Sequence, residues 1–187
     1  MKERRAASKK ESFAGQLLLA HPALRDPNFK RTVILMSVHN ADGALGVVLN
    51  RPLDKQMGEL SAEFATGQLA GVPLYCGGPV NPDQVIIVSW QWLTEENAFQ
   101  LHFGLDPEAA AAVVGTPGVT LRAFLGYSGW SKGQLENEMK HDTWFATTVE
   151  GGELEKRDGT ALWRSILGKI DPELKLLANE PDDPAMN

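Results

Sequence analysis

The chain has 187 residues, which is long enough for one well-cored domain and short for two. Apolar residues make up 43% of it and charged residues 22%, which argues against wholesale disorder, a collagen-like chain and a membrane protein. The single cysteine, Cys76, cannot close an intrachain disulfide, so nothing indicates an oxidising compartment and we expect a cytoplasmic protein. The apolar stretch at residues 17–20 is too short for a signal peptide or a membrane span, and we expect neither.

The net charge of −6 is unevenly distributed along the chain. Residues 1–10 carry five basic side chains and one acidic side chain, so removing their +4 leaves −10 on the other 177 residues. An acidic body repels phosphate backbones, which argues against direct binding to nucleic acid. We predict a disordered basic tail over residues 1–12, one domain over residues 13–177 and a flexible acidic tail over residues 178–187.

Several segments have the composition of β-strands. Residues 32–38 and 44–49 are joined by a segment that ends in Asp42-Gly43, a favoured turn pair, so they predict an antiparallel hairpin. Residues 85–89 and 119–125 predict further, largely buried strands. Weaker candidates are residues 100–103 and 143–149.

Helices are predicted between and after these strands. Met57, Leu60 and Phe64 share one face of a short helix, and residues 108–114 follow a capping Asp-Pro pair. Further helices are predicted from Ser131 to about Lys140, along the apolar stripe of residues 162–170, and after Asp171-Pro172. Strands and helices mix without a regular βαβ rhythm, so we predict a single α+β domain with a mixed sheet.

Three segments beside strands are dense in glycine, proline and polar groups: residues 43–52, 76–80 and 126–136. Glycine permits tight turns and the close approach of a partner, and sites tend to lie in loops at strand ends. The alternative is that these glycines serve only chain reversal and packing. Whether the three segments meet around one open cavity would decide between the two interpretations.

The segments also resemble a known family. Gln16 to Ile34, His39-Asn40, Asn50-Arg51-Pro52, Gly77-Gly-Pro-Val80 and Gly126 to Glu138 resemble signatures of the AlgH/YqgE family, in the family's order. The resemblance spans about residues 13–170. It implies a mixed sheet partly rolled into a small barrel and surrounded by helices. Some members are labelled candidate transcriptional regulators through a genetic link to alginate production, and the family supplies no catalytic residues to transfer.

The candidate sites are therefore judged by the chemistry that their own residues allow. Gly126-Tyr-Ser-Gly-Trp130 has the setting of a serine nucleophile elbow, but Trp130 stands where that motif has its last glycine, and no histidine can be placed against Ser128. The same loop could bind an anion together with Arg51, unless Arg51 pairs with an internal carboxylate. The four histidines are far apart, and nucleotide-binding fingerprints are missing from the sequence. We predict no metal and no cofactor.

The leading hypothesis is a non-enzymatic, cytoplasmic regulatory domain that binds an unknown protein or small-molecule ligand, in an unknown oligomeric state. One alternative is a hydrolase of a small anionic substrate that uses the Gly126–Trp130 loop, with backbone N–H groups stabilising negative charge. A second is direct DNA binding, although no helix-turn-helix is recognisable. The predicted contact residues are His39, Asn50, Arg51, Gly77, Gly78, Pro79, Tyr127, Ser128, Gly129, Trp130 and Gln134.

Overall fold

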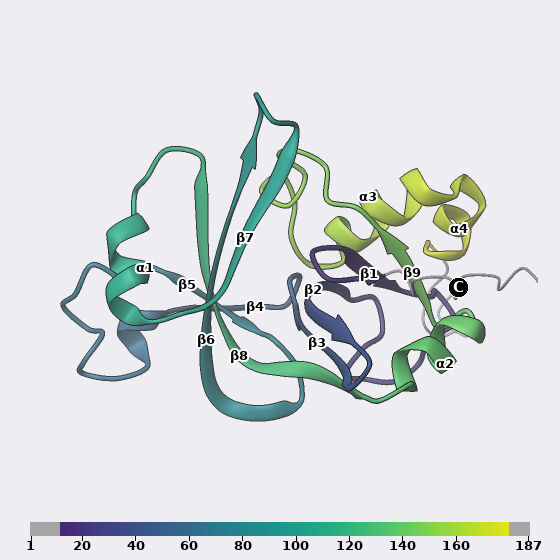
Figure 1. The fold of residues 1–187 in the computed structure, drawn as a ribbon, viewed down its shortest axis with the longest axis horizontal. Coiled ribbons are helices and arrows are strands. Elements are labelled where there is room, and N and C mark those ends of the chain that lie inside the picture. Colours follow the sequence, from purple (N-terminus) through teal and green to yellow (C-terminus); the bar gives the residue numbers. More distant parts are fainter. Residues whose placement is uncertain (1–11, 180–187) are drawn as a thin grey trace, which may run out of the picture.

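The computed structural model describes residues 12–179, which form one α+β domain (Figure 1). Most of the two predicted tails, residues 1–11 and 180–187, lies outside the described residues. The strands are β1 (Leu17–Ala20), β2 (Val33–Asn40), β3 (Gly43–Val48), β4 (Pro52–Gln56), β5 (Pro73–Cys76), β6 (Val80–Leu93), β7 (Ala98–Leu105), β8 (Val119–Ser131) and β9 (Trp144–Thr147). The helices are the 3₁₀ turn η1 (Met57–Glu59), α1 (Pro107–Val113), α2 (Gln134–Lys140), α3 (Gly159–Ile170) and α4 (Pro172–Leu177).

These strands form one mixed, curled sheet in the order β4-β5-β8-β3-β2-β1-β9, with β6 paired to β8 and β7 paired to β6. The β5–β8 pair is parallel and the other pairs are antiparallel. Strand β8 holds the sheet together because its first part pairs with β5 and β6, and its last residues pair with β3. The predicted fold class is therefore confirmed.

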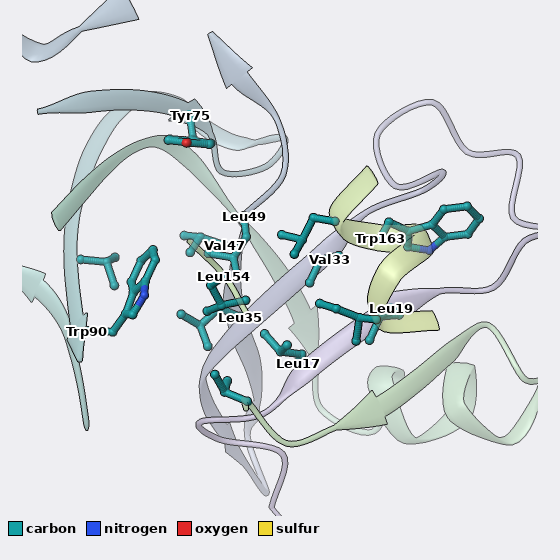
Figure 2. Packing of buried hydrophobic residues seen from close by; sticks show 14 of the residues in the cluster. Leu17, Leu19, Val33, Leu35, Val47, Leu49, Tyr75, Trp90, Leu154 and Trp163 are labelled. Carbon is teal, nitrogen blue, oxygen red and sulfur yellow. The ribbon is translucent and has the colours of Figure 1, made fainter. Parts of the chain in front are cut away.

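Strand β1 is a short apolar run that lies in the interior of the domain. All four residues of β1 are fully buried, because alternate side chains enter two different cores. Leu17 and Leu19 face the core that also holds Leu35, Val47 and Trp163, whereas Leu18 and Ala20 face the opposite core. In Figure 2, Leu17, Leu35 and Val47 lie between Trp90 and Tyr75 on one side and Trp163 on the other. Full burial of each such leucine stabilises the fold by roughly 1.5–3 kcal/mol.

The helices cover the two ends of the sheet. Helix α1 and the turn η1 lie at one end, where Met57 and Ala110 join a third buried cluster. Helices α2, α3 and α4 lie at the other end (Figure 1). None of the helices within residues 12–179 is long and apolar enough to cross a bilayer.

Local signals in the sequence identified most of these elements, and two predictions need correction. The predicted hairpin of β2 and β3 and the capping of α1 by Asp106 are confirmed. The helix expected over residues 57–64 is only the 3₁₀ turn η1, and Leu60 is 37% exposed. Ser131 does not cap α2, because β8 continues through it and Gly133, in the left-handed conformation, precedes the helix.

Candidate functional site

The three glycine-rich segments converge in the sheet. Gly46 on β3 pairs with Ser128 on β8, and the Val48 N–H donates to the carbonyl of Gly77 at 2.9 Å. The Gly77 N–H in turn donates to the carbonyl of Leu125 at 2.8 Å. The segments that the sequence singled out therefore lie side by side, although Gly46 and Ser128 are 82 residues apart along the chain.

Their form differs from the expected open loops. Residues 43–48 are strand β3, and residues 126–131 are the last part of strand β8. A Cβ atom on Gly77 would lie 2.3 Å from the carbonyl oxygen of Gly126, and one on Gly126 would lie 2.4 Å from the carbonyl oxygen of Gly78. These glycines are needed because backbone approaches backbone there, which is the packing interpretation of the motif.

Ser128 forms an internal bond in this arrangement. Its side chain is fully buried, and its hydroxyl donates to the carbonyl oxygen of Gly77 at 3.2 Å. A serine nucleophile needs an exposed hydroxyl and an adjacent base. The geometry gives Ser128 the role of joining β8 to the end of β5 and does not support the hydrolase hypothesis.

Asn50 and Arg51 also bond within the domain. The Asn50 side chain accepts from the Val33 N–H at 2.9 Å and donates to the carbonyls of Arg31 and Gly159 at 2.9 and 3.0 Å. The Arg51 guanidinium donates to the carbonyls of Pro27 and Lys30 at 2.9 and 3.4 Å. Both residues therefore fasten the segment between β1 and β2, and Arg51 does so through backbone carbonyls.

Tyr127, Gly129 and Trp130 line a shallow hollow of about 500 Å³ beside the β2–β3 hairpin, where β8 pairs with β3. We call this surface the hairpin face. Val38, which is 44% exposed, contributes an apolar side chain to it. The other lining residues are Asn40, Asp42, Gly43, Ala44, Leu45 and Val80.

Trp130 is held at the base of this face by a carboxylate on α2. Its indole N–H donates to Glu138 Oε2 at 2.9 Å, and the indole of Trp144 donates to the same oxygen at 2.8 Å. Gln134 braces the same helix by accepting from the Ser131 N–H at 3.0 Å and donating to Glu138 at 2.9 Å. Gln134 and most of the Trp130 ring therefore support the surface from behind.

His39 lies beside a second hollow, of about 280 Å³, next to the hairpin face. The Phe13 N–H donates to His39 Nδ1 at 3.0 Å, so the neutral ring carries its proton on Nε2. Within residues 12–179, buried Nε2 has no hydrogen-bond partner, and its nearest carboxylate oxygen is Glu136 Oε1 at 3.6 Å. A metal ion would need the Nε2 lone pair, which this tautomer does not offer.

The predicted contact residues thus separate into two groups. His39, Tyr127, Gly129 and Trp130 line hollows, and Pro79 is exposed at the turn between β5 and β6. The residues that form internal contacts are Asn50, Arg51, Gly77, Gly78, Ser128 and Gln134. In the part of the chain that the structure describes, no three His, Cys, Asp or Glu side chains are grouped as a metal site.

Sequence reasoning missed a buried polar group beneath the sheet. Arg122 is 7% exposed, donates to the carbonyls of Leu49 and Leu154, and lies over the Tyr75 ring at 4.4 Å. The Tyr75 hydroxyl donates to Asp158 Oδ2 at 2.6 Å. Burial, and to a smaller extent this hydrogen bond, raises the pKa of Tyr75 to about 12. No local motif marks this set, because its members come from four distant segments.

Most of the chain is similar in sequence to known proteins. A sequence model described as AlgH-like matches residues 17–175. A UPF0301 protein of Streptomyces coelicolor is 37% identical over 191 residues, covering 94% of this chain and 96% of its own. A UPF0301 protein of Chlorobaculum tepidum is 34% identical, covering 92% and 95%.

Two solved structures share the fold. The AlgH protein of Pseudomonas aeruginosa, solved in solution, superposes with a TM-score of 0.65 at 24% identity, covering 97% of this chain and all of its own. A crystal structure of a Corynebacterium diphtheriae protein gives a TM-score of 0.66 at 24% identity, covering 96% and 95%. At this level of identity the likeness concerns the fold alone.

Proposed function

The chain belongs to the AlgH-like family, and we propose that it acts as a non-catalytic, regulatory binding protein whose partner is another protein that docks on the hairpin face. The observation that carries this proposal is the convergence of the glycine-rich segments beside an exposed apolar hollow. The buried Ser128 hydroxyl, used in an internal bond, favours binding over bond cleavage at the same place.

The shape of the hollow favours a protein partner over a small molecule. Small-molecule sites are concave enough to bury most of the ligand surface. The hairpin face is instead shallow and open, and its exposed side chains include the apolar Val38. Exposed apolar surface of this kind is typical of contacts between proteins, where a side chain of the partner fills a depression.

The negative charge of this chain indicates which side chains a partner would carry. Asp42 lies on the hairpin face, and the chain outside residues 1–10 carries a net charge of −10. A partner segment that combines an apolar anchor with a nearby Lys or Arg would satisfy both the hollow and this negative field. We therefore expect an apolar, basic segment.

The test uses two matched valines. Val38→Asp places a carboxylate in the hollow, whereas Val114→Asp makes the same change at a 39% exposed position at the end of α1, which is not part of the hollow. A displayed library of random 12-residue peptides is selected against the full chain, and the enriched peptides are titrated against both variants. We expect enriched sequences that pair apolar and basic residues, with binding weakened at least tenfold by Val38→Asp and unchanged by Val114→Asp.

Two results would overturn the proposal. One is a selection that enriches no peptide. The other is enriched peptides that bind Val38→Asp as well as the unchanged chain. Thermal unfolding of both variants checks that a loss of binding does not reflect a loss of folding. A defined substrate turned over by the purified chain would also remove the non-catalytic interpretation.

A further inference from the structure

The segment between β1 and β2, residues 21–31, is a basic loop fastened at several points. Asp26 closes its central turn by accepting from the Asn28 N–H through its side chain and from the Lys30 N–H through its carbonyl. The side chains of Asn50 and Arg51 bind carbonyl groups of the same loop. The loop is therefore a built structure, although its residues follow no regular secondary structure.

Arg31 ends this loop in a conformation that few residues adopt. Its φ is +57°, in the left-handed region, which is uncommon for a residue other than glycine, asparagine or aspartate. The Asn50 side chain holds the Arg31 carbonyl at 2.9 Å, so the surrounding contacts determine this backbone conformation. Such a conformation costs free energy and persists only where the surrounding structure fixes it.

A small pocket of about 100 Å³ lies where this loop meets the end of α4. Its polar side chains are His21, Arg25 and Arg31, and its other lining residues include Trp163, Leu177 and Ala178. The indole N–H of Trp163 is taken by the Ala20 carbonyl at 2.9 Å, and the Ala178 carbonyl accepts from Arg164 at 3.2 Å. This volume is large enough to admit one carboxylate or phosphate group.

The polar groups of this pocket are donors. The Ala23 N–H donates to His21 Nδ1 at 3.0 Å, so the neutral imidazole carries its proton on Nε2. The two guanidinium groups are permanent cations that match oxyanions in pairs of hydrogen bonds. We propose that the pocket lined by His21, Arg25 and Arg31 is a binding site for a single oxyanion group, a carboxylate or a phosphate.

This chemistry has two possible sources. In the sequence, the pocket residue Ala178 is followed within five positions by three acidic residues, Glu180, Asp182 and Asp183, whose carboxylates have the required charge. A free phosphorylated or carboxylated small molecule has it too. The pocket shares no lining residue with the hairpin face, so this inference does not depend on the proposed protein partner.

The experiment titrates the full chain with inorganic phosphate, and separately with acetate, at constant ionic strength. The backbone amide signals of Ala23 and Arg31 are followed by NMR. Arg25→Gln and Arg31→Gln each remove one guanidinium. Arg157→Gln is the matched control, because Arg157 bonds to Ser165 and does not line the pocket. We expect saturable shifts that each pocket variant weakens roughly tenfold and that the control leaves unchanged.

A second arm separates the two sources. The triple variant Glu180→Gln, Asp182→Asn, Asp183→Asn keeps the full length and removes the three carboxylates. Tighter phosphate binding in this variant identifies the chain's own acidic segment as the resident oxyanion, and unchanged saturable binding identifies a free molecule. The proposal fails if neither anion gives saturable shifts in either background. It also fails if Arg157→Gln weakens binding as much as Arg25→Gln does.

Discussion

Arg122 and Tyr75 show how single residues organise the interior of this protein. The Arg122 guanidinium is kept from water between the rings of Tyr75 and Trp90, at 4.4 and 5.2 Å, and it donates to two backbone carbonyls. Buried cations are tolerated where hydrogen bonds and aromatic faces replace the lost hydration. The Tyr75 hydroxyl extends this group to Asp158, which also caps α3.

The stability of the fold is expected to fall above pH 10 because of Tyr75. Its pKa is raised to about 12, chiefly by burial, whereas a tyrosine in the unfolded chain titrates near 10. The neutral phenol therefore contributes its full stabilisation below pH 10, and this contribution is lost as the pH rises towards 12. Comparison of urea unfolding at pH 8 and 11.5 should show a loss about 1–2 kcal/mol larger for the unchanged chain than for Tyr75→Phe. Equal losses for the two proteins would contradict this assignment.

At the scale of elements, the contact between the end of β5 and β8 depends on glycine. Gly77→Ala would place a methyl group 2.3 Å from the Gly126 carbonyl oxygen, so two backbones must separate. We expect a loss of about 2–4 kcal/mol in the free energy of unfolding. Gly67→Ala is the control, because a Cβ there has no atom within 4 Å and the residue has no positive φ. Urea denaturation should show the control within about 1 kcal/mol of the unchanged chain.

This contact also shows where sequence reasoning succeeds and where it stops. Apolar runs and an Asp-Gly turn predicted β2 and β3, since the signal for a hairpin is local. Glycine favours a turn on average, so the sequence predicts a loop after Leu125. The segment instead continues β8, because β3 and the end of β5 pack against it. Pairing between residues so far apart in the chain has no local signal.

For the molecule as a whole, Asn50 links parts that are distant in sequence. Its side chain joins Arg31, Val33 and Gly159, the last of which begins α3, 109 residues further along. Asn50→Ala leaves these three backbone groups without their partner, so we expect a loss of about 3 kcal/mol in thermal or urea unfolding. Asn137→Ala, at an exposed position of α2, should stay within about 0.5 kcal/mol. Equal losses would show that the Asn50 bonds contribute nothing specific.

The folding of the whole chain explains why the candidate sites could be predicted only in part. The resemblance to the AlgH/YqgE family indicated the glycine-rich segments, and the fold class followed from it and from the mixture of elements. The hollow beside Val38 and the pocket beside Arg31 arise where side chains from separate segments meet. Asn50 and Arg51, expected as ligand contacts, instead shape the loop that carries Arg25 and Arg31. Asn50 and Arg51 therefore contribute to the pocket indirectly, by fixing the loop whose side chains line it.

The pair of indoles that share the Glu138 carboxylate has a practical consequence. Trp130 reaches the hairpin face, and the ring of Trp144 lies edge-on to the Trp130 ring, with 5.9 Å between the ring centroids. Both indoles bond to Glu138 on α2, so both rings depend on the position of that helix. An indole whose N–H loses a charged acceptor and meets water changes its emission wavelength. The intrinsic fluorescence of the protein would therefore report any loosening of that helix without an attached dye.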